Sequence, residues 1–88
     1  MATHTATYKG HTIVIKKSWF TSTKHLIVDG EIQDVSGMLL ESNTIMWGRV
    51  KSGDGCGDII KVRLTYRNLL SFFTTCWVFV NDTLIFKE

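Results

Sequence analysis

Basic and aromatic side chains gather around the connection that follows the first apolar strand pattern of this chain. Lysine ammonium groups contact phosphate and aromatic rings stack on bases, so together they provide the chemistry for a small anionic, nucleotide-like ligand. The same lysines also suit a solvated hairpin whose charges discourage aggregation between sheet edges. The candidate ligand-binding residues are Lys16, Lys17, Trp19, Phe20, Lys24, His25 and Arg49.

A glycine-rich segment, Gly-Asp-Gly-Cys-Gly-Asp at residues 53–58, is the most distinctive local pattern. Alternating glycines can turn backbone N–H groups to one side and bind an anion. The segment lacks the Gly-Lys-Ser/Thr ending of a phosphate-binding loop and the ligand spacing of a calcium loop. Its two aspartates would also repel an anion unless they point away. We therefore favour a plain hairpin loop over an anion site.

Residues able to perform catalysis or hold a metal are few and scattered. The chain has two cysteines, Cys56 and Cys76, and its three histidines all lie in the first third of the sequence. No Cys or His spacing matches a zinc site, and no serine stands in a Gly-x-Ser-x-Gly elbow. The carboxylates of Asp29, Glu31 and Asp34 suit local capping of a turn. The sequence predicts a protein that is not an enzyme, with no catalytic residue, metal or cofactor, and a buried Cys76.

Composition determines the fold class. The chain has 88 residues, enough for one domain over 1–88, and 44% are hydrophobic against 20% charged, which excludes disorder. Valine, isoleucine and threonine together number 26, whereas alanine occurs twice, a bias that favours strands over helices. The formal net charge of +2 is too weak to indicate nucleic acid. No apolar run is long enough to cross a membrane, and the N-terminus does not resemble a secretory signal, so we expect a cytoplasmic location.

Alternating apolar and polar residues predict an all-β fold, a small antiparallel sandwich or barrel of about six to eight strands built from hairpins. Asp29-Gly30 is the strongest hairpin signal, because a type I′ turn needs positive φ at both central residues. Residues 38–41 fit one helical turn, and 76–80 lack alternation. The expected strands cover residues 12–16, 24–29, 31–34, 43–50, 59–66, 74–80 and 83–86.

A faint internal repeat relates the two halves of the chain. Residues 12–32 and 59–84 both show a strand, an excursion, a second strand, a tight turn and a third strand, although any antiparallel meander gives this pattern. Val28-Asp29-Gly30-Glu31 and the strand order resemble the repeats of the Fas apoptotic inhibitory molecule family, small β-sandwiches with a Val-Asp-Gly turn. The second half has Val80-Asn81-Asp82 at this place. The resemblance implies a non-enzymatic β-sandwich that engages other proteins.

The chain carries more apolar side chains than a small sandwich can bury. Val14, Ile27 and Met46 fall on faces expected to meet water, and several aromatic residues lie in connections. Exposing several such side chains forfeits several kcal/mol at about 25 cal/mol per Å², which is comparable to the stability of a small domain. We expect a cover, most simply a second copy of the chain, with a host protein or a ligand as alternatives.

These observations lead to three functional hypotheses, of which the least favoured is an enzyme that uses the loop at residues 53–58. The first is a non-enzymatic, homo-oligomeric binding protein that sequesters a small nucleotide-like anion at subunit boundaries; in type, though not in motif, this is similar to small phage anti-defence proteins that trap nucleotides. The alternative is an inhibitor or adaptor that binds a protein through an apolar patch or a sheet edge.

Overall fold

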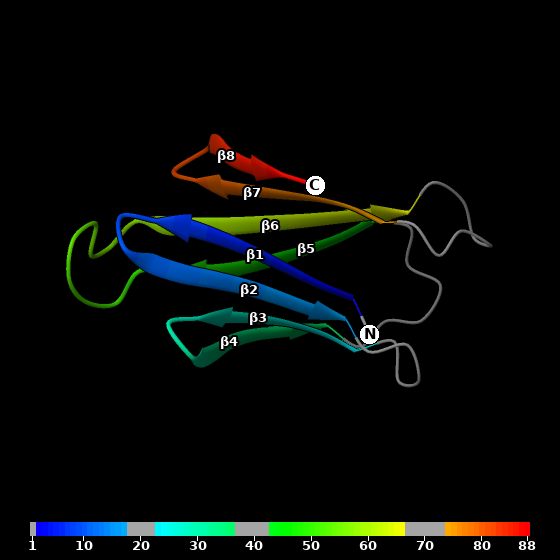
Figure 1. The fold of residues 1–88 in the computed structure, drawn as a ribbon, viewed down its shortest axis with the longest axis horizontal. Helices are drawn as coiled ribbons and strands as arrows, with labels where there is room; N and C mark the ends of the chain where they lie inside the picture. The colour runs from blue at the N-terminus through cyan, green and yellow to red at the C-terminus, as the bar shows by residue number, and fades with distance from the viewer. Residues whose placement is uncertain (1, 18–22, 37–42, 67–73) are drawn as a thin grey trace.

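The computed structural model describes residues 2–17, 23–36, 43–66 and 74–88, and these form eight strands in two four-stranded antiparallel sheets (Figure 1). Each sheet is a simple meander, β1-β2-β3-β4 in the first and β5-β6-β7-β8 in the second. The predicted all-β sandwich is confirmed. The strands are β1 (Ala2–Tyr8), β2 (His11–Lys17), β3 (Lys24–Val28), β4 (Glu31–Ser36), β5 (Asn43–Arg49), β6 (Ile59–Tyr66), β7 (Thr74–Val80) and β8 (Thr83–Lys87).

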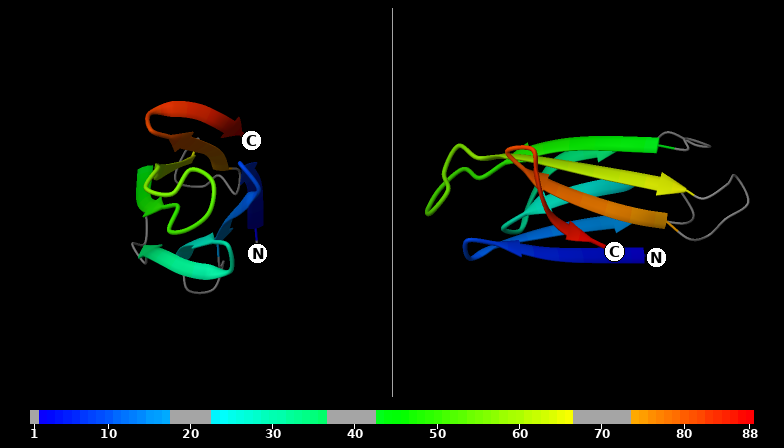
Figure 2. Two further views of the ribbon diagram at one scale, coloured as in Figure 1. Left: turned by 90° about the vertical axis from the view of Figure 1, so that its left-hand side faces the viewer. Right: turned by 90° about the horizontal axis from the view of Figure 1, so that it is seen from above.

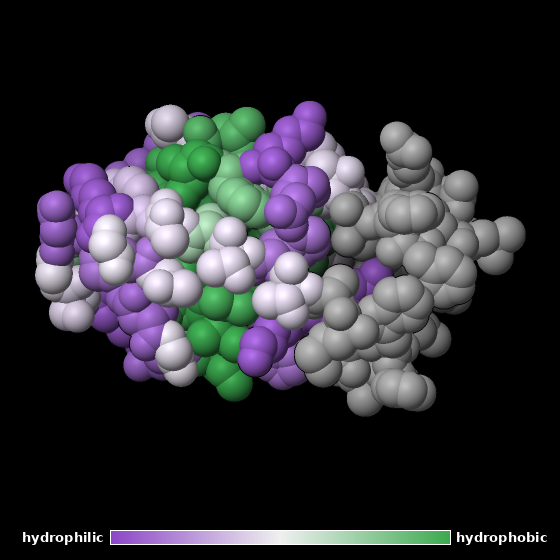
Figure 3. Space-filling view, in the orientation of Figure 1, coloured by the Kyte–Doolittle hydropathy of each residue, from purple (hydrophilic) through white to green (hydrophobic). Residues whose placement is uncertain are grey.

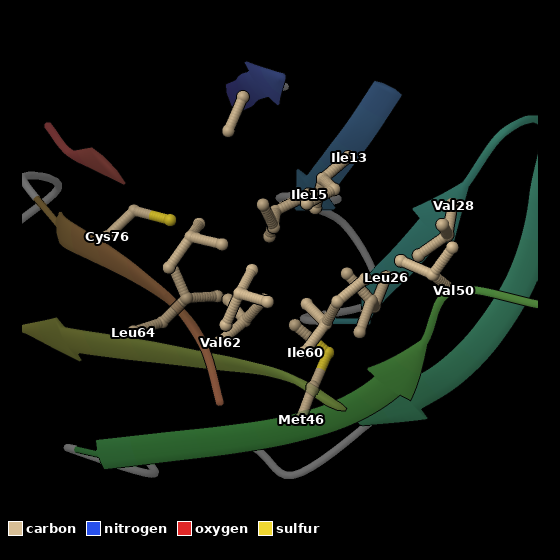
Figure 4. Close-up of a cluster of buried hydrophobic side chains, with 13 residues drawn as sticks. Ile13, Ile15, Leu26, Val28, Met46, Val50, Ile60, Val62, Leu64 and Cys76 are labelled. Carbon is tan, nitrogen blue, oxygen red and sulfur yellow. The ribbon is translucent and has the colours of Figure 1, made fainter. Parts of the chain in front are cut away.

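The two sheets enclose a core of aliphatic side chains that alternate with outward residues along each strand (Figures 2 and 4). Ile13 and Ile15 of β2 face Ile60 and Val62 of β6 across the core, and all four are completely buried. This arrangement follows from the period of two along a strand. The buried apolar residues are Ala6, Ile13, Ile15, Leu26, Val28, Met46, Val50, Ile60, Val62, Leu64, Cys76, Val78 and Val80.

Three two-residue turns have positive φ at both central positions. The predicted Asp29-Gly30 turn is confirmed, with φ values of 51° and 82°. Lys9-Gly10 makes the same turn, at 48° and 82°, and Asn81-Asp82 makes a third, at 49° and 68°. Glycine tolerates this conformation without a steric penalty, whereas Asp82 adopts it with a Cβ atom.

The internal repeat extends to individual hydrogen bonds. Asp29 N–H donates to the Thr12 carbonyl and the Asp29 carboxylate accepts from the Thr12 N–H, both at 2.9 Å. In the second sheet Asn81 bonds to Ile59 through the same pair of atoms, also at 2.9 Å. Both halves therefore use an Asx side chain at the first turn position to hold the start of the neighbouring strand.

A β-bulge also recurs at the same place in each sheet. The register shifts between Leu26 and Ile27 in the β3–β4 hairpin, and between Val78 and Phe79 in the β7–β8 hairpin. The extra residue is Gln33 in the first sheet and Ile85 in the second, each three positions after its turn. The repeat thus relates β1–β4 to β5–β8 strand by strand.

The structure corrects three expectations from the sequence. β1 was not predicted, because its threonines and alanines lack apolar alternation, yet it forms a full edge strand. Met46 is completely buried rather than on a wet face. β7 does alternate, with Cys76 and Val78 buried and Trp77 between them turned outward. The predicted helical turn at residues 38–41 lies outside the described part of the chain.

Candidate functional site

The residues predicted to bind a ligand on the first hairpin are divided between two faces of the first sheet. Lys16 and His25 lie opposite each other on the outer face. Lys17 and Lys24 are also opposite each other, but on the inner face. Lys24 is only 1% exposed and donates from Nζ to the Thr44 hydroxyl at 3.0 Å, while burial lowers the pKa of Lys17. The four side chains therefore do not converge.

The remaining predicted residues are Trp19, Phe20 and Arg49. Trp19 and Phe20 lie outside the described residues. Arg49 is exposed at the end of β5 in the second sheet. Ligand binding by this set stays a prediction, but the described residues place its cations in three separate environments.

A different group of basic and aromatic residues meets on the outer face of the second sheet. In one cross-strand row, Lys61 of β6 stands between Trp47 of β5 and Phe79 of β7. In the adjacent row, Trp77 of β7 stands between Arg63 of β6 and Lys87 of β8. We call this surface the cationic aromatic face; its residues are Trp47, Lys61, Arg63, Trp77, Phe79 and Lys87.

Cations and rings are in contact throughout this face. Lys61 Nζ lies 5.5 Å from the Trp47 ring centre and 5.7 Å from that of Phe79. The Trp77 ring lies 5.3 Å from the Arg63 guanidinium carbon and 5.8 Å from Lys87 Nζ. A cation over an aromatic face is attracted by the ring quadrupole, so each of these contacts orients both the cation and the ring. Trp47 nevertheless remains 52% exposed, which leaves ring surface for a ligand.

The charge of the cationic aromatic face has one sign. Its neighbours in the same two rows are apolar, Ile45 and Leu84, and no outward-facing residue of β5–β8 that the structure describes carries a carboxylate. The described strands of this sheet therefore bring only positive charge to the cationic aromatic face. In the sequence these residues appeared only as apolar excess and scattered charge, although outward alternation along β5, β6 and β7 was a usable signal.

A shallow groove borders this face where β4 meets β5. Its volume is about 490 Å³, and Ile32, Trp47 and Ile59 supply apolar walls. Arg49 and Lys51 add two cations, although Lys51 also pairs with Glu31. Trp47 thus contributes to both the groove and the cationic aromatic face.

The segment 53–58 acts as a structural loop. Gly53, Gly55 and Gly57 all have positive φ, between 80° and 94°. The N–H groups of Cys56, Gly57 and Asp58 already donate to backbone carbonyls, at 3.3, 2.8 and 2.9 Å. These three donors are therefore used within the backbone of the loop, and the positive φ values of the glycines allow its conformation.

His11 fastens this loop to the first sheet. Its Nδ1 lies 2.6 Å from Asp29 Oδ2 and its Nε2 lies 2.7 Å from the Asp54 carbonyl. Both partners are acceptors, so the protonated ring, in which both nitrogens donate, satisfies both contacts. The hydrogen bond to Asp29 and the one to the Asp54 backbone raise the pKa of His11. Nearby, Tyr8 donates to Asp58 at 2.5 Å.

The two thiols differ in burial. Cys76 is completely buried, as predicted, and desolvation raises its pKa to about 12. Cys56 is exposed on the loop, and its Sγ lies 3.2 Å from the Lys51 carbonyl. Within the described residues no three His, Cys, Asp or Glu side chains are grouped so as to hold a metal ion.

The fold and site define a small antiparallel β-sandwich with one cationic aromatic outer face. No helix in the described residues is long and apolar enough to span a membrane. Comparison with protein-family models, curated proteins and solved structures gives no match to this chain.

Proposed function

We propose that this protein is a non-enzymatic binding protein whose cationic aromatic face holds a small, nucleotide-like anion. One observation carries the proposal: three aromatic rings alternate with three cations on a single sheet face. Rings offer stacking surfaces for a base, and the cations offer contacts for phosphate.

The groove beside Trp47 suggests how a nucleotide would be oriented on this face. A base stacked on Trp47 would place its phosphates within reach of Lys61 on one side, or of Arg49 on the other. Arg49 was among the residues predicted from the sequence, and its guanidinium suits bidentate phosphate contacts. Homo-oligomerisation is a separate part of the proposal and is not needed for this contact.

Binding can be measured by quenching of tryptophan fluorescence with ATP, and by calorimetry with ATP and with inorganic triphosphate. We expect ATP to bind more tightly than triphosphate, because stacking contributes about 1–3 kcal/mol per base. Trp47→Ala should weaken ATP binding by about fivefold or more, and Lys61→Glu should weaken both ligands. Lys16→Glu on the first sheet is the matched control and should leave ATP binding unchanged.

Three outcomes would contradict this function. They are the absence of ATP binding by the folded protein, equal affinity for ATP and triphosphate, and weakening by Lys16→Glu as large as that by Lys61→Glu. Recovery of ATP unchanged after incubation supports a binding protein, whereas ADP would indicate an enzyme.

A second candidate is an inhibitor or adaptor that binds another protein through apolar surface. The observation in its favour is that Ile32, Val35, Ile45, Trp47 and Ile59 are exposed on neighbouring strands around the β4–β5 boundary. Val35 is 51% exposed and does not line the groove beside Trp47, so Val35→Glu should weaken such an interaction and leave ATP binding intact, which separates the two candidates.

A further inference from the structure

β1 is an edge strand with one free side. Among the strands that the structure describes it pairs only with β2, and Tyr8 and His11 flank the two-residue turn between them. Residues flanking such a turn exchange hydrogen bonds, and the pattern then alternates along the strand. The peptide groups of Thr3, Thr5 and Thr7 therefore point away from β2, and no described residue bonds to them.

The equivalent boundary in the other half of the repeat is closed. β5 corresponds to β1 and faces β4, whose side chains bond to three outward backbone groups of β5. Gln33 donates to the Arg49 carbonyl at 2.9 Å and accepts from the Arg49 N–H at 2.7 Å. The Asp34 carboxylate accepts from the Trp47 N–H at 2.9 Å.

At the β8–β1 boundary the same two positions cannot form such bonds. Ile85 and Phe86 stand in β8 where Gln33 and Asp34 stand in β4, and both pack against the core instead. His4 of β1 pairs with Glu88, the residue that follows β8, at 2.7 Å. β1 and β8 lie at this boundary, near the two chain termini (Figures 1 and 2).

β1 also lacks the devices that prevent pairing between sheet edges. Such devices are lysines, prolines and bulges on the edge strand. The seven residues of β1 include none of them, and its pairing with β2 has no register shift. β8 has both a bulge and the outward-facing Lys87. On the face seen in Figure 3, residues of intermediate hydropathy form a pale region between two apolar ones.

We propose that β1 pairs antiparallel with β1 of a second copy of this chain, about a two-fold axis through Thr5. Thr5 then stands opposite its own copy, and Thr3 stands opposite Thr7. The outward N–H and C=O groups of all three threonines form the new ladder, and no like charges meet within it. Threonine pairs across strands are favourable, and a two-fold interface needs this self-complementarity. The two first sheets become one continuous sheet.

This proposal does not depend on the proposed ligand. The cationic aromatic face belongs to the second sheet and stays accessible in the dimer, and repulsion between Lys61, Arg63 and Lys87 disfavours that face as the dimer interface. The dimer thus carries two copies of the cationic aromatic face.

Thr5→Pro tests the interface, because the Thr5 N–H makes no bond to β2 and proline is tolerated at such an edge position. Thr5→Val, which keeps the N–H, is the matched control. Sedimentation velocity over a concentration series should show wild type and Thr5→Val approaching twice the 10.0 kDa of one chain, and Thr5→Pro staying near 10.0 kDa. Circular dichroism checks that each variant keeps its strands.

A second measurement covers the case in which Thr5→Pro fails to fold. Hydrogen exchange at the Thr3, Thr5 and Thr7 amides of the wild type should slow with rising protein concentration. Exchange at the Thr12 amide, which bonds to Asp29 of the same chain, should not change. A wild type that stays monomeric at every concentration overturns the proposal and leaves the edge to a strand of another protein. If Thr5→Pro still dimerises, the proposal is overturned, because the dimer interface then lies outside β1.

Discussion

The two sheets of this protein share a plan and differ on their outer faces. Each is a four-stranded meander in which an Asp or Asn at the first turn position bonds to the neighbouring strand. Each also has a bulge at the same place and buries aliphatic side chains inward. Outward, the strands β1 and β2 present mainly threonines, whereas β5, β6 and β7 present Trp47, Lys61 and Trp77. Folding constrains the inner faces in the same way because both contribute to one core. The outer faces are free of that constraint, so their difference points to function.

The largest expected effect tests whether the inner faces are equivalent. Ile13 and Ile60 occupy matching positions and are both completely buried. Ile13→Ala and Ile60→Ala should each lower the free energy of unfolding by about 2–5 kcal/mol, through lost burial and the cavity left behind. Urea denaturation measures this.

Ile45→Ala on the outer face is the control, and its 43% exposure predicts a loss well below either core variant. If one of the two core variants behaved like Ile45→Ala, the inner faces would not contribute alike.

The next effect concerns the boundary between the sheets where side chains of β4 bond to backbone groups of β5. Gln33→Ala removes two hydrogen bonds to the Arg49 backbone and should cost about 1–2 kcal/mol in urea denaturation, since each bond contributes about 0.5–1.5 kcal/mol. Gln33→Glu keeps an acceptor for the Arg49 N–H but loses the donor. Its free energy of unfolding should therefore fall between those of the wild type and Gln33→Ala. No loss with Gln33→Ala would mean that solvent replaces both bonds and that the two boundaries do not differ in stability.

A smaller effect depends on pH. The pKa of His11 is raised in the folded protein, so the folded state holds this proton more tightly than the unfolded chain. The resulting stabilisation is complete below the pKa of an unfolded histidine, about 6.5, and is lost as pH rises through the higher folded value. The urea midpoint should therefore fall as pH is raised from about 6 into the alkaline range.

His11→Gln should remove this pH dependence while keeping one hydrogen bond. The pKa of Asp29 is lowered, mainly by the Thr12 N–H and then by His11, so its contribution is lost only in acid, as pH falls through the lowered value. A wild-type slope that survived in His11→Gln would assign it to another group.

The smallest expected effect concerns the second residue of the Asp29-Gly30 and Asn81-Asp82 turns. Gly30 adopts φ 82° in the first sheet, but the second sheet has Asp82 at φ 68° in the same place. Asp82→Gly should raise the stability by about 0.5 kcal/mol, because relief of the strained φ is partly offset by the greater entropy of unfolded glycine. Gly30→Asp should lower it. Thermal unfolding of both variants measures the difference, and a loss with Asp82→Gly would show that the Asp82 side chain stabilises its turn.

Local patterns were sufficient for most of the fold. The Asp29-Gly30 turn and the alternation of Ile60, Val62 and Leu64 were predicted correctly, because each depends on neighbours within one hairpin or strand. β1 was missed for the converse reason: its threonines form a strand only because β2 lies beside them. Exposed apolar side chains were also expected, and six remain among the described residues: Ile32, Val35, Ile45, Trp47, Ile59 and Leu84.

The sequence by itself determined the class of fold, the turns and the inward residues of most strands, since composition and a period of two act over short distances. Only the tertiary structure decided which cations meet which rings. Lys61 lies between Trp47 and Phe79, residues far apart in the chain, because sheet register aligns three strands. Register also turned Lys24 into the core and left the outer edge of β1 open, since both depend on which strand becomes the neighbour.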